Sequence, residues 1–155
     1  MRRVFAMRIL LINHYAGSPT LGMEYRPHWM SEHWIAAGHQ VLVVAGSFSH
    51  LRRFQPRSSV FRETQIEGVP HRILPLPRYR GNGIGRVLNM LCFGAQLLGL
   101  APWLLRWQPD VVVCSSTHPF DIPAGLFIAR KSGARLIYEV HDLWPQTPIQ
   151  LGNIN

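Results

Sequence analysis

Polar and aromatic side chains gather at the end of a short apolar run near the end of the chain: Glu139, His141, Asp142 and Trp144. The run itself, residues 136–140, is rich in aliphatic and aromatic residues and predicts a buried strand. Two prolines then prevent its continuation as a central strand. An imidazole at a strand end can act as an acid, a base or a hydrogen-bond donor near neutral pH. A structural histidine with satisfied hydrogen bonds is the alternative.

Two other loops follow apolar runs in the same way. Residues 14–22 come after a predicted strand at 8–13, and residues 115–118 come after one at 109–115. Gly17 and Gly22 would let backbone N–H groups approach a ligand or a phosphate closely. The sequence contains no G-x-G-x-x-G fingerprint, P-loop or G-x-S-x-G motif, so a dinucleotide site and a serine nucleophile elbow are not predicted.

The remaining elements must bring these loops together. Strands and helices alternate along the chain, which predicts an α/β fold with a Rossmann-like, doubly wound, mostly parallel sheet. Right-handed crossovers would place the strands at 8–13, 109–115 and 136–140 side by side, so their loops would share the ligand crevice at the carboxyl edge. The other predicted elements are a helix over 23–37, a strand over 39–45, a hairpin over 65–74 turning at Glu67-Gly68, a helix over 86–107, and a helix capped by Asp121 that ends at Gly133.

The charge is unusual for a chain of 155 residues. The formal net charge is +8, and Lys131 is the only lysine, so the excess comes from arginine. A basic surface favours a polyanionic partner such as lipid headgroups, pyrophosphate or nucleic acid, although solvated surface charge is the simpler alternative. Arginines and aromatic residues alternate over 48–62, which suits a membrane surface or nucleic acid, or a flexible loop. Because no nucleic-acid recognition motif is present, we expect no nucleic-acid partner.

The predicted helix at 86–107 is nearly all apolar and approaches the length of a transmembrane span. Asn89, Gln96 and Pro102 favour a buried or interfacial helix instead. Trp103 and the arginines at the helix ends suit a membrane interface.

Cysteine and histidine usage limits the remaining chemistry. Cys92 and Cys114 are isolated, so a reducing, cytoplasmic compartment fits best. His28 and Glu32 are four residues apart, but no H-E-x-x-H motif is present, so we expect exposed helix residues and no metal.

Three segments resemble the amino-terminal domain of family 4 glycosyltransferases with the GT-B fold: MRILLINHYA at 7–16, PDVVV at 109–113 and EVHDLWP at 139–145, followed by QTP at 146–148. Within that family, the sequence is similar to bacterial transferases of O-antigen and capsule synthesis, such as N-acetyl-fucosaminyl transferases. The resemblance covers essentially the whole chain.

The resemblance implies a retaining transfer of sugar from a nucleotide sugar to a lipid-linked or polysaccharide acceptor, with no cofactor beyond the donor substrate. It places His141 at the reaction centre as the catalytic residue. It implies that the donor phosphates lie near Gly17, Ser18, Ser116, Thr117 and Asp142. It also implies that a membrane- and acceptor-facing surface meets a polyprenyl-pyrophosphate acceptor at the inner membrane; we assign to this surface Arg52, Arg53, Arg57, Arg78, Arg80 and Trp103.

In this family a second domain binds the donor, and the sequence stops shortly after the shared motif. Residues 1–155 are therefore expected to be an incomplete N-terminal domain, inactive alone, at the cytoplasmic side of the membrane, whose partner is a separate C-terminal donor domain. The rival hypothesis is a non-catalytic, flavodoxin-like binding module that uses the same crevice.

Overall fold

The computed structural model describes residues 6–141, without the side chains of residues 59–61. Its centre is a six-stranded sheet with the order β3-β4-β2-β1-β5-β6, in which only the β3–β4 pair is antiparallel. The strands are β1 (Arg8–Ile12), β2 (Gln40–Gly46), β3 (Ser59–Ile66), β4 (Val69–Leu74), β5 (Val111–Cys114) and β6 (Arg135–Tyr138).

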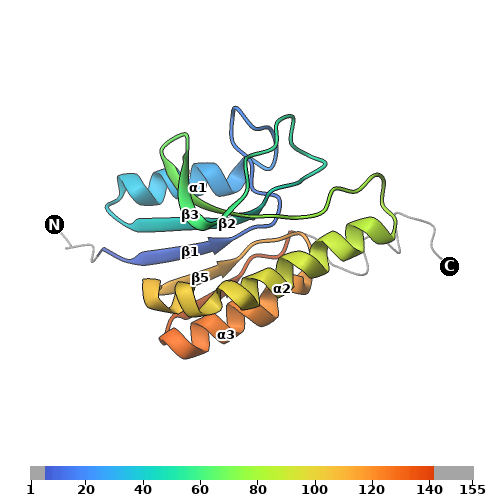
Figure 1. Cartoon of the computed structure of the whole chain (residues 1–155). Coiled ribbons are helices and arrows are strands. Elements are labelled where there is room, and N and C mark those ends of the chain that lie inside the picture. The colour runs from blue at the N-terminus through green and yellow to red at the C-terminus, as the bar shows by residue number, and fades with distance from the viewer. Residues whose placement is uncertain (1–5, 142–155) are drawn as a thin grey trace.

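Helices cover both faces of the sheet, as Figure 1 shows. Helix α1 (Arg26–Ala36) lies on one face, and α2 (Ile84–Trp107) and α3 (Ile122–Ser132) lie together on the other. A short 3-10 helix, η1 (Pro119–Asp121), precedes α3. The chain builds outward from β1 to β2 and β4, and α2 then carries it back to β5 on the other side of β1. The strand order therefore reverses between β1 and β5, where open α/β sheets bind their ligands.

The apolar residues of β1 alternate between two cores. Leu10 and Ile12 pack toward α2 and α3, whereas Ile9 and Leu11 pack on the opposite face, toward α1. This alternation follows from the two-residue period of a strand. A strand that is buried on both faces needs a continuous apolar run, which is what the sequence provides.

The predicted architecture is confirmed, including the adjacency of β1, β5 and β6. The hairpin turns at Glu67-Gly68, and both residues have positive φ. Helix α3 ends at Gly133 in the left-handed conformation. Three details differ from prediction. Helix α1 begins at Arg26, and Met23 is half-exposed before it. Strand β6 is a largely exposed edge of the described sheet rather than a buried strand.

Asp121 is the third difference. It occupies the position before α3 but makes no capping hydrogen bond to that helix. Its carboxylate instead accepts a hydrogen bond from the N–H of Ser116 at 3.2 Å, so it fixes the loop after β5. Burial raises the pKa of Asp121 to about 6.

Helix α2 is long and apolar enough to cross a membrane by length and composition. In this fold one side of it packs on the sheet, through residues that include Phe93, Leu97 and Leu104. Asn89 is buried and donates a hydrogen bond to the carbonyl of Pro77. This packing is that of a core helix with one open side, in line with the prediction of a buried or interfacial helix.

Candidate functional site at the carboxyl edge

His141 lies at the carboxyl edge of the sheet, beside the end of β5. Its Nε2 is 2.9 Å from the hydroxyl oxygen of Ser115 and 3.4 Å from Oε2 of Glu139. The hydroxyl of Ser115 donates to the same Oε2 at 2.7 Å. The His141 side chain keeps 16% of its surface exposed, so it is neither sealed in the core nor fully solvated.

The hydroxyl has one hydrogen, and a carboxylate only accepts. Because that hydrogen points to Glu139, Nε2 of His141 must carry the proton that reaches the Ser115 oxygen. The neutral ring is then the Nε2–H tautomer, and Nδ1 becomes its acceptor atom. Nδ1 has no hydrogen-bond partner among residues 6–141. The side chain can therefore offer this atom to a ligand.

Glu139 is held from its other side by Arg26 at the start of α1. The guanidinium donates to Oε1 of Glu139 and forms an ion pair with it. Partial burial alone would raise the pKa of Glu139, but hydrogen bonds from Ser115 and Arg26 outweigh it and lower the pKa. The ionised carboxylate fixes the Ser115 hydroxyl, and through it the orientation of the His141 ring.

Asn13, at the end of β1, ties this cluster to the point where the strand order reverses. Its side-chain amide donates to the carbonyl of Ser115 at 2.6 Å and lies 3.3 Å from the hydroxyl oxygen. Side chains from the ends of β1, β5 and β6 thus meet at one place, as the sequence predicts. Their convergence requires the parallel sheet, because only there do the three strand ends share an edge.

The glycine loop after β1 has a different geometry from the one expected. The N–H of Gly17 donates to the carbonyl of Glu24, and the N–H groups of Ser18 and Gly22 bond across the loop to each other's carbonyls. Ser18 is fully buried. A Cβ on Gly17 would lie 1.9 Å from the Gly22 carbonyl oxygen, so glycine is needed there for the chain to close on itself. The expectation of open backbone donors is wrong in this structure, and donor-phosphate contact at Gly17 and Ser18 stays a prediction.

Ser116 is also buried rather than directed into the crevice. Its hydroxyl oxygen accepts a hydrogen bond from the N–H of His14 at 3.1 Å. The Ser116 side chain therefore holds the loop after β1, and its contact with donor phosphate stays a prediction. Thr117, the next residue, is half-buried. Its contact with phosphate stays a prediction, and Asp142 lies outside the described residues.

Two buried histidines, His14 and His118, form a structural pair behind the site. Nδ1 of His14 lies 2.7 Å from Nε2 of His118, and the His14 ring stacks between Tyr15 and Phe93. Burial, assisted by the neighbouring His118, lowers the pKa of His14 well below its usual value, and burial lowers the pKa of His118 to about 4. Both rings are therefore neutral near pH 7. They join the loops after β1 and β5 to α2.

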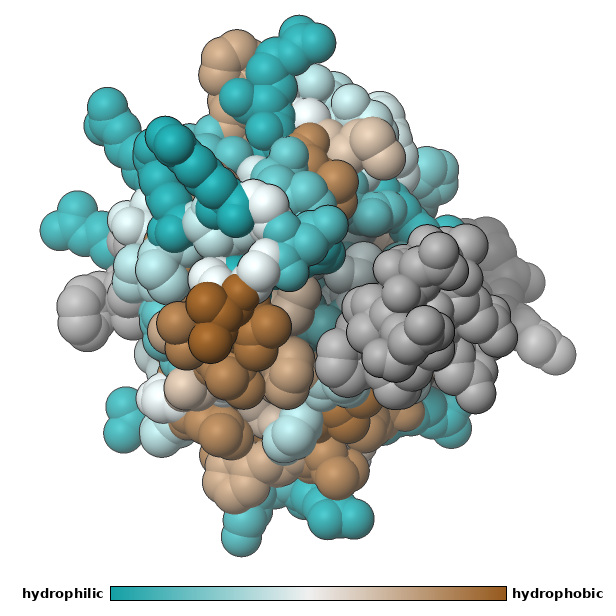
Figure 2. All heavy atoms as spheres, turned by 90° about the vertical axis from the view of Figure 1, so that its right-hand side faces the viewer, coloured by the Kyte–Doolittle hydropathy of each residue, from teal (hydrophilic) through white to brown (hydrophobic). Residues whose placement is uncertain are grey.

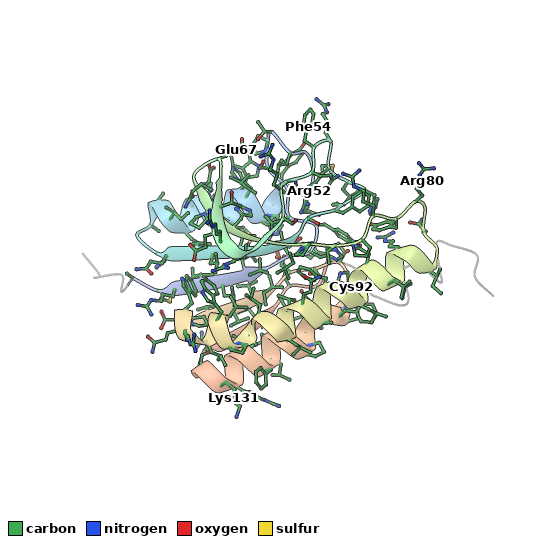
Figure 3. The ribbon with its side chains drawn as sticks, in the orientation of Figure 1. Arg52, Phe54, Glu67, Arg80, Cys92 and Lys131 are labelled. Carbon is green, nitrogen blue, oxygen red and sulfur yellow. The ribbon has the colours of Figure 1, made fainter. Side chains whose placement is uncertain are left out.

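Arg52 was expected to face a membrane, and it does not. Its guanidinium is buried and donates to the carbonyls of Ala16 and Gly46, each at 2.7 Å, with a third contact of 3.4 Å to His14. Figure 3 places it inside the loops, whereas Phe54 and Arg80 extend outward. Arg52 therefore acts as a clamp between the loops after β1 and β2.

The other assigned arginines are exposed: Arg53, Arg57, Arg78 and Arg80. Two neighbouring clefts of about 500 and 450 Å³ share Phe48 and Arg78 as lining residues. Arg57 lines the first cleft, and Arg80 lines the second. Their contact with an acceptor or a membrane stays a prediction.

Trp103 does not stand free at a surface. It is partly buried against the core, and the guanidinium carbon of Arg72 lies 3.6 Å from its ring centroid. The cation–π contact and the core packing hold the ring in place. Contact of Trp103 with a membrane stays a prediction.

The expectation of an exposed His28 is also wrong. His28 is buried, and its Nε2 lies 3.4 Å from a carboxylate oxygen of the half-exposed Glu32. Within residues 6–141, no group of three or more His, Cys, Asp or Glu side chains could hold a metal ion.

Sequence reasoning placed Ser115 and Glu139 near the site but gave them no role, and it missed Arg26 altogether. Glu139 precedes the histidine by two residues, so the strand period puts both side chains on one side, which could have indicated the pair. Arg26 is 113 positions away from Glu139. No pattern in the sequence connects these two residues.

The fold and the site define a class: a doubly wound α/β domain with a polar cluster at the switch point of its sheet. The model of the glycosyl transferase 4-like domain family matches residues 22–153. The chain therefore belongs to the glycosyl transferase 4-like domain family, and its architecture is that of the Rossmann-like N-terminal domain of that family. This bears out the resemblance to family 4 glycosyltransferases, though not the finer likeness to fucosaminyl transferases.

The solved structures compared with the chain are consistent with this fold. Two crystal structures of the C-terminal domain of a hydrogenase from Pyrococcus furiosus, residues 78–226 and 83–215, are similar to it. Their TM-scores are 0.59 and 0.58, at 16% and 15% identity, over 86% of this chain and 91% of each of theirs. At such identity the likeness concerns the fold alone. No curated protein matches the chain.

Proposed function

We propose that this domain forms the acceptor-side half of a retaining glycosyltransferase, which moves a sugar from a nucleotide sugar to a lipid-linked or polysaccharide acceptor in O-antigen or capsule synthesis. The single observation that carries the proposal is the position of His141. Its imidazole lies at the switch point of the sheet, is oriented by Ser115 and Glu139, and has no hydrogen-bond partner at Nδ1 among residues 6–141. Family membership supports the general reaction.

The transfer exchanges one bond for another. An acceptor oxygen bonds to the anomeric carbon of the sugar, and the bond from that carbon to the nucleoside diphosphate breaks. The proton of the acceptor hydroxyl leaves with the diphosphate. Positive charge grows on the sugar ring during this exchange, so a positioned hydrogen-bond partner at the ring is worth most in the transition state. Nδ1 of His141 is the atom that we assign to that contact.

The donor would be bound mainly by a second domain, either fused or separate. The expected partners are therefore the nucleotide sugar, a polyprenyl-pyrophosphate-linked acceptor and a C-terminal donor domain at the cytoplasmic face of the inner membrane. The cluster at the carboxyl edge contributes a histidine and an oriented carboxylate, and no ion or cofactor is needed for the roles assigned to them.

The test replaces His141 in an enzyme that carries both this domain and a donor-binding domain. His141→Ala should lower kcat by about 100-fold or more, the usual scale for a group that acts in the transition state. The matched control is His33→Ala, because His33 is an exposed histidine of α1 whose ring, among residues 6–141, bonds to the Trp29 carbonyl of its own helix. Transfer is measured as radiolabelled sugar incorporated into the lipid acceptor.

Unchanged turnover in the His141→Ala enzyme would overturn the assignment and favour a binding module. The 155-residue chain alone is expected to transfer no sugar. Transfer by this chain without a donor domain would refute the division of work between two domains.

A further inference from the structure

The first residue of helix α1 is an arginine, in a position that is unfavourable for a cation. Arg26 lies at the amino-terminal end of α1, which carries the partial positive charge of the helix dipole. The first turn of this helix contains no acidic residue, and no side chain caps it. A second positive charge at this end opposes helix stability, so the needs of α1 alone do not account for Arg26.

The negative charge that Arg26 meets comes from the end of β6. Its guanidinium donates to Oε1 of Glu139 and forms an ion pair with it, and 57% of the Arg26 side chain is exposed. Figure 2 shows the molecule from the carboxyl edge: the side that carries α1 is largely hydrophilic, and a hydrophobic patch lies on the side of α2. An ion pair this open to water contributes little to stability, so its effect is to be sought at Glu139 itself.

The two carboxylate oxygens of Glu139 have separate partners. Oε1 binds Arg26, whereas Oε2 accepts the Ser115 hydroxyl at 2.7 Å and lies 3.4 Å from Nε2 of His141. One oxygen is therefore tied to a cation, and the other faces the imidazole. Because Arg26 holds Oε1, Oε2 keeps the direction in which it receives the Ser115 hydrogen.

The charge of Glu139 acts on the protonation of His141. A carboxylate 3.4 Å from an imidazole nitrogen favours the doubly protonated ring, which has no acceptor atom. A cation on the other oxygen of that carboxylate offsets its charge, and the neutral ring then keeps Nδ1 as an acceptor. Asp121 fixes the loop after β5 instead, and Asp142 lies outside the described residues. Within residues 6–141, the charged pair of this cluster is therefore Glu139 with Arg26.

We infer that Arg26 is a positioning residue for His141. It holds Glu139 and offsets its charge, so that the imidazole stays neutral, with its hydrogen on Nε2 and with Nδ1 as the acceptor for a ligand. Arg26 acts through Glu139 and not on a substrate. Its part in sugar transfer rests on the proposed function, whereas the state of the ring is measured in the 155-residue chain without any transfer.

Nuclear magnetic resonance of the imidazole nitrogens tests the inference. Their chemical shifts report which nitrogen carries the hydrogen and at which pH the ring takes up a second proton; the signals of His141 are those missing from the His141→Ala chain. In the Arg26→Gln chain, half-protonation of this ring should occur at a pH higher by about 0.5 pH unit or more, because the carboxylate is no longer offset. Arg26→Lys keeps the charge and should retain most of the parent behaviour.

The matched control removes an arginine from the other end of β6. Arg135 is exposed at the first position of that strand, and Arg135→Gln should leave the His141 signals unchanged. A double variant tests the route of the effect: Arg26→Gln with Glu139→Gln should give signals close to those of Glu139→Gln alone, because no carboxylate is left to offset. Circular dichroism and urea unfolding verify that every variant is folded.

Unchanged His141 signals in the Arg26→Gln chain, or an equal change in the Arg135→Gln chain, would overturn the inference. In the two-domain enzyme, Arg26→Gln should move the acid limb of the pH profile of kcat upward by the same amount as the nuclear magnetic resonance titration. A titration that moves while this limb stays in place would overturn the part of Arg26 in the reaction. If His141→Ala leaves turnover unchanged, the proposed function fails, and the effect of Arg26 on the ring is still decided by the titration.

Discussion

Replacing Arg52 by methionine tests whether this arginine is a structural clamp rather than a surface charge. The guanidinium donates to the carbonyls of Ala16 and Gly46, each at 2.7 Å, and joins the loops that follow β1 and β2. Methionine fills much of the same space but cannot donate. The Arg52→Met variant should therefore leave both carbonyls without this donor.

The loss can be worked from the two short hydrogen bonds. Bonds to a charged group contribute about 1.5–3 kcal/mol each to the free energy of unfolding. We take the lower end, because burial disfavours the charged guanidinium and lowers the pKa of Arg52 to about 10. The free energy of unfolding should then fall by about 3 kcal/mol, which for a chain of this size corresponds to a Tm lower by roughly 6–12 °C.

Urea unfolding followed by circular dichroism measures this change. Arg53→Met is the matched control, since Arg53 is exposed and its backbone N–H bonds to Leu21 in either variant. The control should change the free energy of unfolding by less than about 0.5 kcal/mol. Equal stability of the two variants would refute the proposed role of Arg52 as a structural clamp between the two loops.

Three further substitutions have defined outcomes. The folded pKa of Asp121 is raised to about 6 from 3.8, so its contribution to stability is present below pH 3.8 and is lost as pH rises through 6. The Asp121→Asn variant should therefore gain stability relative to the parent between these pH values. A stability difference in urea unfolding that does not change with pH would contradict this. Gly125→Ala should destabilise by about 1–3 kcal/mol in thermal unfolding, because its Cβ would lie 2.2 Å from Sγ of Cys114, and an unchanged Tm would show that the helix can shift. Ser115→Ala in the two-domain enzyme removes the hydroxyl that orients His141, so it should lower kcat. The free energy of unfolding should change by no more than about 1 kcal/mol. Lost stability with unchanged kcat would show that the hydroxyl is only structural.

The chain's local patterns were sufficient to predict the sheet and its helices. Continuous apolar runs identified the strands, and Glu67-Gly68 and Gly133 marked a turn and a helix end where the backbone takes positive φ. The handedness of crossovers then placed β5 beside β1 and β6 beside β5. These inferences succeed because strand period, turn chemistry and crossover handedness are properties of short segments.

The same reasoning failed where the direction of a side chain depends on distant residues. Arg52 and Arg53 are neighbours with the same side chain, yet one is buried among carbonyls and the other is exposed. Glycines that suggested an open phosphate loop instead allow the chain to hydrogen-bond to itself. Nothing local distinguishes these outcomes.

The sequence by itself therefore determined the fold class, the neighbourhood of β1, β5 and β6 in the sheet and the position of His141 at the carboxyl edge. Only the tertiary structure decided which polar groups join it. Ser115 and Glu139 orient its ring, Arg26 at the start of α1 holds Glu139, and one side of α2 is buried while its other side stays exposed. The physical reason is that periodicity depends on residues that are neighbours in the sequence. Burial and hydrogen-bond partners depend on segments that meet only after the chain has folded.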